Sequence, residues 1–267
     1  MEKHLHLSVI IPMYNESARV IPTLEDAVLW LHEAPWTSEI VLVDDGSKDS
    51  TVERVTPKLL ERPLGALQRV RLIRHERNRG KGAAVRTGLA GSEGAWRLMM
   101  DADNSTRVSE VVRLLAEAER SGAGLVCGSR NVADSDVVTR PSRKLMGSMF
   151  RIALRMLGMG MLRDTQCGFK LYRSDVASAI AEIAKEDRFA FDLEHLLIAD
   201  RLGVGVREVG VSWTHRDGGT IRPVRDGLRM LRDAARIRVR YARGLPPVLV
   251  EVKPLRKARE APAERVG

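Results

Sequence analysis

The chain has 267 residues, of which 44% are hydrophobic and 30% are charged, and its formal net charge is +9. This length and apolar content allow a sizeable core and exclude a chain that is disordered throughout. The excess of basic residues indicates an anionic partner such as phosphate groups, anionic lipid or nucleic acid, without choosing among them.

Two features bound the compartment. The cysteines, Cys127 and Cys167, belong to no Cys-x-x-Cys pair and no zinc-like cluster, so we expect reduced thiols and a cytosolic protein. The apolar run before Pro12 is only about five residues long, too short for a signal peptide. No stretch approaches the roughly 20 uncharged apolar residues of a spanning helix. We therefore expect any membrane contact to be peripheral.

The first half of the chain alternates short β-branched runs with amphipathic segments of helical length. This rhythm predicts an α/β fold with a mostly parallel sheet covered by helices on both faces. The expected strands are residues 7–12, 39–44, 69–73, 96–101 and 124–128, and the expected helices lie near 17–33, 49–60, 81–91 and 107–121.

The rhythm changes from about residue 130. Residues 141–162 are Met-rich and apolar but are interrupted by arginines, residues 186–202 predict a helix, and residues 206–213 alternate as a strand does. From Gly244 onward the chain carries four prolines and mixed charge, which predicts a largely disordered tail.

Residues 222–243 contain eight arginines and two aspartates. Arginines spaced three and four residues apart stack on one helix face, beside an apolar stripe. The row consists of Arg225, Arg229, Arg232, Arg236, Arg240 and Arg243, and the stripe of Val224, Leu228, Leu231, Ala235 and Val239.

Asp101 and Asp103 directly follow the apolar strand WRLMM. Two carboxylates separated by one residue at a strand end can offer oxygens to one Mg²⁺ or Mn²⁺ ion and leave positions open for a diphosphate. A polar turn before the next helix is the alternative for such a pair taken alone.

Polar residues also follow the first two strands. Asp44 and Asp45 end the second, and Pro12, Tyr14 and Glu16 follow the first. The carboxyl ends of parallel strands meet at one rim of a sheet, where such folds bind ligands. The acids can accept from a base N–H or ribose hydroxyls, and Tyr14 can lie against a nucleobase. Together these loops predict a nucleotide site.

Asn78–Ala84, with the sequence NRGKGAA, opens a predicted helix. Its glycines allow a phosphate to approach the backbone, the helix N-terminus favours anions, and Lys81 adds a positive charge. The spacing is not that of a P-loop, and a simple helix-opening turn is the alternative.

The ordered motifs PMYNE, DDGSKDST, NRGKGAAVRTG, DAD, GSR, DTQCGFK, FAFDLE and VSWTHRDGG together resemble family 2 of the glycosyltransferases. The likeness is greatest to the group that acts on dolichyl and other polyprenyl phosphates, on its glucosyl branch, and runs from about residue 7 to 243. It implies a GT-A fold, Rossmann-like, with C-terminal amphipathic helices. The implied domain is 1–243, made of a nucleotide-binding half (1–128), an acceptor half (129–221) and the Arg-rich helix (222–243), followed by the tail 244–267.

The resemblance also implies roles for matching residues. Asp101 and Asp103 match the metal and diphosphate motif, Arg130, Arg143 and Gln166 match the acceptor side, and Asn104 departs from relatives that have glycine there, so we expect a different local turn. The Gln-x-x-Arg-Trp signature of processive relatives is absent, which argues against a polysaccharide synthase. The implied nucleotide-sugar site consists of Pro12, Tyr14, Glu16, Asp44, Asp45, Lys81, Asp101, Ala102 and Asp103.

The expected reaction is inverting transfer of a hexose from a nucleotide sugar, with UDP-glucose favoured, to a polyprenyl phosphate. The acceptor phosphate is already nucleophilic at pH 7 and needs no strong base. Asp103, Arg130 and Arg143 are the expected catalytic residues. For a hydroxyl acceptor, Asp192 and Glu194 are candidate bases, or else structural partners of nearby arginines. GDP-mannose, a UDP-N-acetylhexosamine or a soluble acceptor remain alternatives.

Residues 141–162 and 222–243 could lie on an anionic membrane, which places the enzyme peripherally on the inner face of the cell membrane. A solvated helix, or one that grips acidic loops of its own fold, is the alternative for 222–243, and a homo-oligomer is possible. A nucleic-acid-binding protein is disfavoured, because aromatic residues make up only 4% of the chain and no stacking platform is visible.

Overall fold

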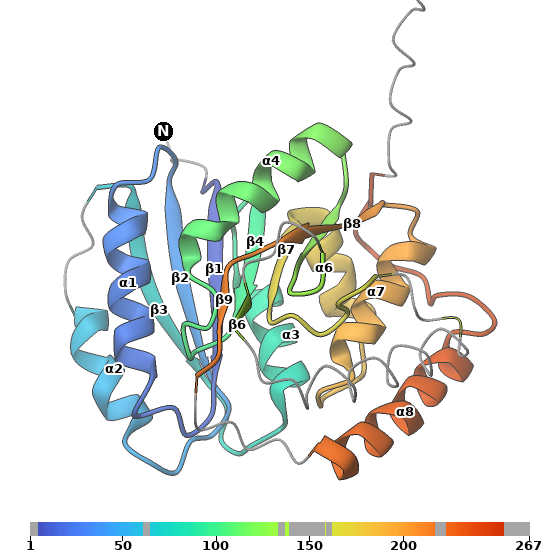
Figure 1. Ribbon diagram of the computed structural model, residues 1–267, viewed down its shortest axis with the longest axis horizontal. Helices are drawn as coiled ribbons and strands as arrows, with labels where there is room; N and C mark the ends of the chain where they lie inside the picture. Colours follow the sequence, from blue (N-terminus) through green and yellow to red (C-terminus); the bar gives the residue numbers. More distant parts are fainter. Residues whose placement is uncertain are drawn as a thin grey trace, which may run out of the picture.

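The computed structural model describes residues 5–60, 65–132, 137–138, 158, 162–216 and 223–253. In this part of the chain a seven-stranded sheet with the order β3-β2-β1-β4-β7-β5-β8 forms the centre, beside a two-stranded ribbon of β6 and β9. Helices cover both faces of the sheet (Figure 1).

The strands are β1 (Leu7–Met13), β2 (Ser38–Asp44), β3 (Leu67–Arg74), β4 (Trp96–Met100), β5 (Leu125–Ser129), β6 (Val137–Val138), β7 (Phe169–Arg173), β8 (Val206–Gly210) and β9 (Trp213–Thr214). The helices are α1 (Val20–His32), α2 (Thr51–Leu60), α3 (Lys81–Gly91), the short 3₁₀ helix η1 (Val108–Glu110), α4 (Val111–Ser121), α6 (Ser174–Ile183), α7 (Phe191–Arg201) and α8 (Pro223–Arg240).

The sheet has its topological switch point at β1. The chain passes from β1 to β2 and β3 on one side, then returns to place β4 on the other side, and both neighbours pair with β1 in parallel. Ligands of such sheets bind in the crevice outside the carboxyl ends of the strands at this point. The loops after β1 and β4 therefore stand at the position where a ligand is expected.

β7 is the one antiparallel member of the seven-stranded sheet. It pairs antiparallel with β4 through Phe169–Arg173 and with β5 through Lys170–Tyr172. β5 in turn pairs in parallel with β8. β7 thus joins the β3-β2-β1-β4 part of the sheet to the β5-β8 part.

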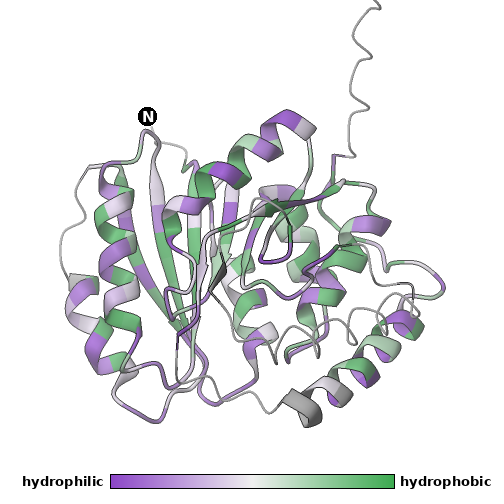
Figure 2. Ribbon diagram, in the orientation of Figure 1, coloured by the Kyte–Doolittle hydropathy of each residue, from purple (hydrophilic) through white to green (hydrophobic). Residues whose placement is uncertain are grey.

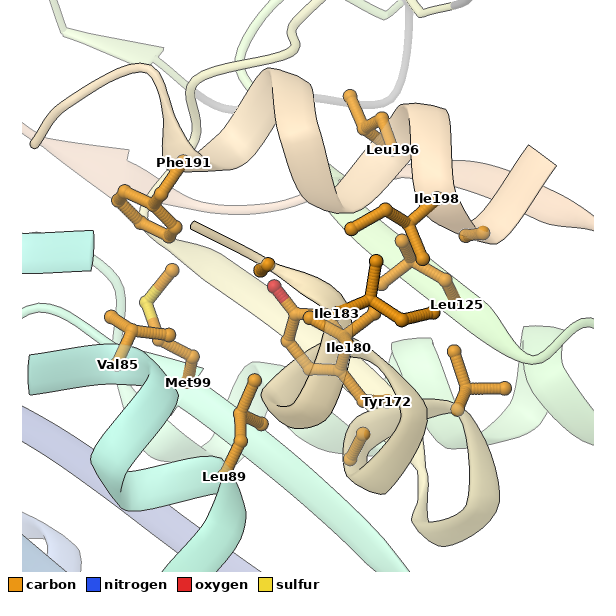
Figure 3. Close-up of a cluster of buried hydrophobic side chains, with 14 of the residues drawn as sticks. Val85, Leu89, Met99, Leu125, Tyr172, Ile180, Ile183, Phe191, Leu196 and Ile198 are labelled. Atoms are coloured by element: carbon orange, nitrogen blue, oxygen red, sulfur yellow. The ribbon is translucent and has the colours of Figure 1, made fainter. Parts of the chain in front are cut away.

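Two apolar layers sandwich the sheet, because its strands bury side chains on both faces. α1, α2 and α4 pack on one face, and α3, α6, α7 and α8 pack on the other. In Figure 2 much of the central sheet is green, apolar, whereas the helices alternate between green, apolar and purple, polar residues. In the second layer Tyr172, Phe191 and Met99 meet aliphatic side chains of α3, α6 and α7 (Figure 3).

α8 docks mainly through side chains outside the apolar stripe of the sequence analysis. Met230, Ala234, Ile237 and Tyr241 pack against the core together with Leu231 of that stripe, whereas Val239 of the stripe is 75% exposed. The side chains of Val224 and Leu228 lie outside the description. Of the predicted arginine row, Arg229, Arg232, Arg236, Arg240 and Arg243 are exposed, and the side chain of Arg225 lies outside the description.

The beginning of the predicted tail differs from the expectation. Leu245, Val248 and Val252 pack against the core, and the backbone N–H of Lys253 donates to Asp175. Apolar residues between the prolines thus hold 244–253 on the domain. Residues 254–267 lie outside the described residues, as does most of the Met-rich segment 141–162. No described helix is both long and apolar enough to span a bilayer.

Candidate active site

One cleft of about 560 Å³ opens at the carboxyl ends of β1, β2 and β4. The start of α3, the loop before α7, and α8 complete its walls. It is lined by Pro12, Met13, Tyr14, Glu16, Arg19, Asp45, Asn78, Arg79, Gly80, Lys81, Ala84, Asp101, Ala102, Asp103, Arg188, Phe189, Ala190, Arg229, Met230 and Asp233. Glu16, Asp45 and Asp103 therefore share one cavity.

Asp101 and Asp103 stand at the end of β4 with oxygens available to a ligand. Lys81 Nζ donates to Asp101 Oδ1 at 2.5 Å. The N–H of Ser105 donates to Asp103 Oδ1 at 3.0 Å, while Asp103 Oδ2 lies 4.0 Å from the Arg19 guanidinium. The Asp101 and Asp103 side chains remain 35% and 24% exposed.

This donor set fits a Mg²⁺ or Mn²⁺ ion held jointly with a diphosphate. No group of three or more acidic, His or Cys side chains able to hold a metal occurs among the described residues, so the protein itself would supply two carboxylates and the substrate the other oxygens, as Mg²⁺ sites commonly require. The side-chain oxygen Oδ1 of Asn104, the residue after Asp103, is buried and has no hydrogen-bond partner in the described part of the chain. The turn thus holds an acceptor that the protein does not satisfy.

The turn itself accommodates asparagine. Asn104 has φ 53° and Asn15 has φ 54°, in the left-handed region that asparagine tolerates better than most residues other than glycine. The departure at Asn104 therefore keeps a backbone conformation that a glycine could adopt.

Glu16 adds a third acid to this side of the cleft. Arg19 holds it through two hydrogen bonds of 2.7 and 2.6 Å. Burial raises the pKa of Glu16, and the charges of Asp103 and Asp101 act in the same direction against the pairing with Arg19. Tyr14 is 40% exposed and lines the same wall. Acids that repel one another favour a bound cation.

Asp44 and Asp45 are held by their own neighbours. Asp44 is fully buried, accepts from the Ser47 N–H and from Arg74 Nε, and does not line the cleft. Asp45 lines the cleft, but its oxygens accept from the N–H groups of Arg79 and Gly80 at 2.9 and 2.7 Å. Asp45 thereby anchors the turn that opens α3.

The glycines of this turn leave room for the close approach of backbone atoms from residues 186–188. A Cβ on Gly80 would overlap the carbonyl of Asp187, and one on Gly82 would overlap the carbonyl of Glu186. Gly80 also has φ 114°, which disfavours any side chain. The turn therefore packs tightly against residues 186–188 and presents Lys81 from a fixed position.

Arg130, Asp164 and Gln166 lie together beside the cleft but are not among its lining residues. Arg130 donates from Nε and NH2 to both oxygens of Asp164, at 2.7 and 2.9 Å, and its guanidinium lies 5.5 Å from the Trp213 ring. Burial would lower the pKa of Arg130, but the charge and hydrogen bonds of Asp164 outweigh burial and raise this pKa above its ordinary value. The Gln166 amide contacts the sulfur of Met230, which lines the cleft. Arg143 lies outside the described residues.

Asp192 and Glu194 are buried on α7, away from the cleft lining. Asp192 accepts from Lys170 Nζ at 2.7 Å. Glu194 accepts from two backbone N–H groups, from Arg240 at 2.7 Å and from the Tyr241 hydroxyl at 2.7 Å. These contacts correspond to the structural-partner alternative of the sequence analysis.

Sequence reasoning missed the wall of the cleft formed by the second half of the chain. Arg188 and Phe189 come from the loop before α7, and Arg229, Met230 and Asp233 come from α8. No local pattern marks them, since only the fold brings α8 beside the end of β4. Arg229 and Met230 lie on a helix for which the sequence suggested a membrane contact, a solvated surface or a grip on acidic loops of the fold, but no part in the cleft.

Comparison with known proteins decides the family. The model of glycosyl transferase family 2 matches residues 8–180. The chain belongs to this family. It is also 38% identical over 253 residues to a dolichyl-phosphate beta-glucosyltransferase of Dictyostelium discoideum, covering 91% of this chain and 76% of that protein, and 36% identical over 250 residues to the mouse protein of the same name, covering 89% and 76%.

Solved structures agree on the fold. Mannosyl-3-phosphoglycerate synthase from Rubrobacter xylanophilus superposes with a TM-score of 0.64 at 17% identity, over 90% of this chain and 74% of that one. Glucosyl-3-phosphoglycerate synthase from Mycobacterium tuberculosis, solved with Mn²⁺, UDP-glucose and phosphoglyceric acid, gives a TM-score of 0.61 at 21% identity, over 87% and 78%. The chain is thus a glycosyltransferase with a GT-A fold, which confirms the predicted family and fold class.

Proposed function

We propose that this glycosyltransferase moves glucose from UDP-glucose to a polyprenyl phosphate such as dolichyl phosphate, with inversion at the anomeric carbon. The observation that carries the proposal is the single cleft in which Tyr14, Lys81, Asp101 and Asp103 meet, in a chain similar along most of its length to dolichyl-phosphate beta-glucosyltransferases.

The donor side of the proposal uses the residues at the ends of β1 and β4. Tyr14 offers an exposed ring to the uracil, and Lys81 holds positive charge beside the diphosphate. Asp101 and Asp103 would hold Mg²⁺ or Mn²⁺, which neutralises charge on the departing UDP when bound. Asp44 and Asp45 would act by shaping the nucleotide pocket and its glycine turn.

The acceptor side requires positive charge and no strong base. A phosphate monoester carries nucleophilic oxygen at pH 7, since its second pKa is about 6. Arg130, Arg143 and Gln166 are proposed to orient that phosphate. Because Asp164 already neutralises Arg130, we propose that Arg130 contributes mainly by directed N–H groups and that Arg143 supplies net charge.

We propose that the outer face of α8 contacts an anionic membrane, which places the enzyme on the cytoplasmic surface of the cell membrane. Arg232 and Arg236 are 59% and 61% exposed, and Val239 lies among them at 75%. A helix face that carries exposed arginines beside an exposed valine suits the interface between headgroups and acyl chains. A peripheral site would bring the cleft to a lipid acceptor.

The test is a panel of radiolabelled UDP-glucose, GDP-mannose, UDP-galactose and UDP-N-acetylglucosamine, each incubated with polyprenyl phosphate and Mn²⁺ and scored for label in the lipid phase. We expect label from UDP-glucose, and almost none from the Asp103→Ala variant or after chelation. A matched polyprenyl alcohol should remain unlabelled. Label that appears only in a water-soluble product would refute the lipid acceptor, and label from another donor would refute the glucosyl assignment.

A further inference from the structure

Lys170 lies in the middle of the sheet with no exposed surface. Its ammonium donates to Asp192 Oδ1 at 2.7 Å and to the carbonyl of Cys167 at 2.6 Å. The desolvation of a buried ion pair commonly outweighs the attraction between its charges, so an apolar pair of similar volume would hold the sheet at least as well. Stability alone therefore gives no reason for this pair.

The Cys167 carbonyl connects Lys170 to the backbone segment that hydrogen-bonds to Asp101. This carbonyl belongs to the peptide that joins Cys167 to Gly168. Gly168 O accepts from the Asp101 N–H at 3.1 Å, and a Cβ on Gly168 would overlap the Asp101 carboxylate. By fixing that peptide, Lys170 fixes the support on which Asp101 rests.

Asp192 connects the same pair to Lys81. The charges of Asp101 and Asp192 both act on the ammonium of Lys81. The Phe191 ring, next to Asp192 on α7, lies 6.0 Å from Lys81 Nζ. Positive and negative charges therefore alternate inward from the cleft in the order Asp101, Lys81, Asp192 and Lys170.

We propose that Lys170 and Asp192 are positioning residues for the metal and diphosphate site, holding Asp101 and Lys81 from behind without contacting substrate. The inference rests on the proposed function, because it takes the Asp101 side of the cleft as the place where the diphosphate binds. It gives Asp192 a task other than that of a general base.

The variants separate positioning from stability. In Lys170→Met, the buried Asp192 loses its partner and competes with Asp101 for Lys81, so both thermal stability and ligand binding should fall. In the double variant Lys170→Met/Asp192→Leu no buried charge is left unpaired, and stability should return close to that of the wild type. Asp101 and Lys81 would still lack their support.

The measurement is the Kd of UDP in the presence of Mn²⁺, by calorimetry, together with the melting temperature. We expect the double variant to bind UDP about tenfold or more weakly than the wild type, the usual effect of removing groups that orient a metal ligand, despite its restored melting temperature. Glu39→Gln is the control, because Glu39 is a fully buried, ion-paired carboxylate at the opposite end of the strands. It should lose stability without any change in this Kd.

A double variant that binds UDP as tightly as the wild type overturns the inference, whatever the acceptor proves to be. A wild-type enzyme that binds UDP with Mn²⁺ but labels no lipid refutes the proposed function alone, and the variants still decide the positioning role. A wild type that binds no UDP with Mn²⁺ overturns both.

Discussion

Gly168 and Asp101 show how closely the site depends on its immediate neighbours. The backbone of Gly168 accepts the Asp101 N–H, and its missing side chain leaves the space that the Asp101 carboxylate fills. Asp101 belongs to the predicted metal motif, whereas Gly168 belongs to a motif assigned to the acceptor side. Their contact means that the acceptor-side segment also shapes the proposed metal site.

Gly168→Ala should therefore displace Asp101 and abolish most Mn²⁺-dependent release of UDP from UDP-glucose. Overpacking of this kind typically costs about 1–3 kcal/mol of stability, so the fold should survive in a weakened form. The release assay, with a melting curve on the same sample, checks the prediction.

Gly227→Ala provides the comparison, since a Cβ there would meet nothing within 4 Å. That variant should retain its activity and gain slightly in stability, as alanine favours the helix more than glycine does. Equal activity in the two variants would show that Asp101 does not need its observed position.

The residue types of the site could be read from the sequence, but their partners could not. The spacing of Asp101 and Asp103 at a strand end, and the placement of Lys81 at a helix start, predicted a diphosphate site, and the structure brings these three residues into one cleft with Glu16. That Asp45 would hold backbone N–H groups, and Asp192 a buried lysine, depends on contacts between segments far apart in the chain, which no local pattern records.

Among the elements, α8 combines two surfaces on one helix. Its inner face packs on the core and lines the cleft, and its last turn is fixed when Arg240 and Tyr241 donate to the buried Glu194. Its outer face carries the exposed arginines. The sequence revealed the arginine row but not the residues that dock. Periodicity alone does not favour the mixed stripe of Met230, Asp233 and Ala234 over Leu231 and Ala235, of which Leu231 also packs against the core.

Arg232, Arg236 and Arg243 can be tested without disturbing the docking contacts of Arg240. Replacing all three by glutamine should weaken co-sedimentation with phosphatidylglycerol vesicles by about a hundredfold, since each basic residue near an anionic surface contributes about 1 kcal/mol. Turnover of a short, water-soluble prenyl phosphate should be unchanged. Undiminished vesicle binding by the triple variant would remove α8 as the membrane contact.

At the scale of the whole molecule, the two ends of the sheet differ in how their charged groups are arranged. The cleft is lined by acidic and basic side chains around an open site. At the opposite end, the buried carboxylate of Glu39 is surrounded by hydrogen-bond donors. This carboxylate accepts from Ser8, the Glu93 N–H, Arg69 and Arg71, at 2.6 to 2.8 Å. Burial raises the pKa of Glu39, but these donors outweigh burial and bring it below its ordinary value of 4.5.

A carboxyl whose pKa is lower in the folded state stabilises the fold above its unfolded pKa, and this stabilisation is lost as the pH falls through the folded pKa. Glu39→Gln should therefore reduce the free energy of unfolding by about 2 kcal/mol at pH 7. The difference from the wild type should shrink below pH 4.5. Urea unfolding of both proteins at neutral and acid pH provides the measurement, and a difference that does not vary with pH would contradict it.

Across the whole fold, the predicted strands of the first half all form within two residues of their expected ends, and the helices between them form as well. β7 and α6 went unpredicted. FKLYR is short and charged, and a lysine in the sheet centre contradicts the apolar pattern by which buried strands are recognised. The pairing of Lys170 with Asp192 and its hydrogen bond to the Cys167 carbonyl make that position tolerable.

The place of β7 also bears on how the chain can fold during synthesis. Since β7 alone bridges β4 and β5, a nascent chain that has emerged only as far as β5 holds two strand edges with no link between them. Exposed edges invite pairing with other chains. Closure of the seven-stranded sheet therefore has to wait until the residues of β7 have left the ribosome.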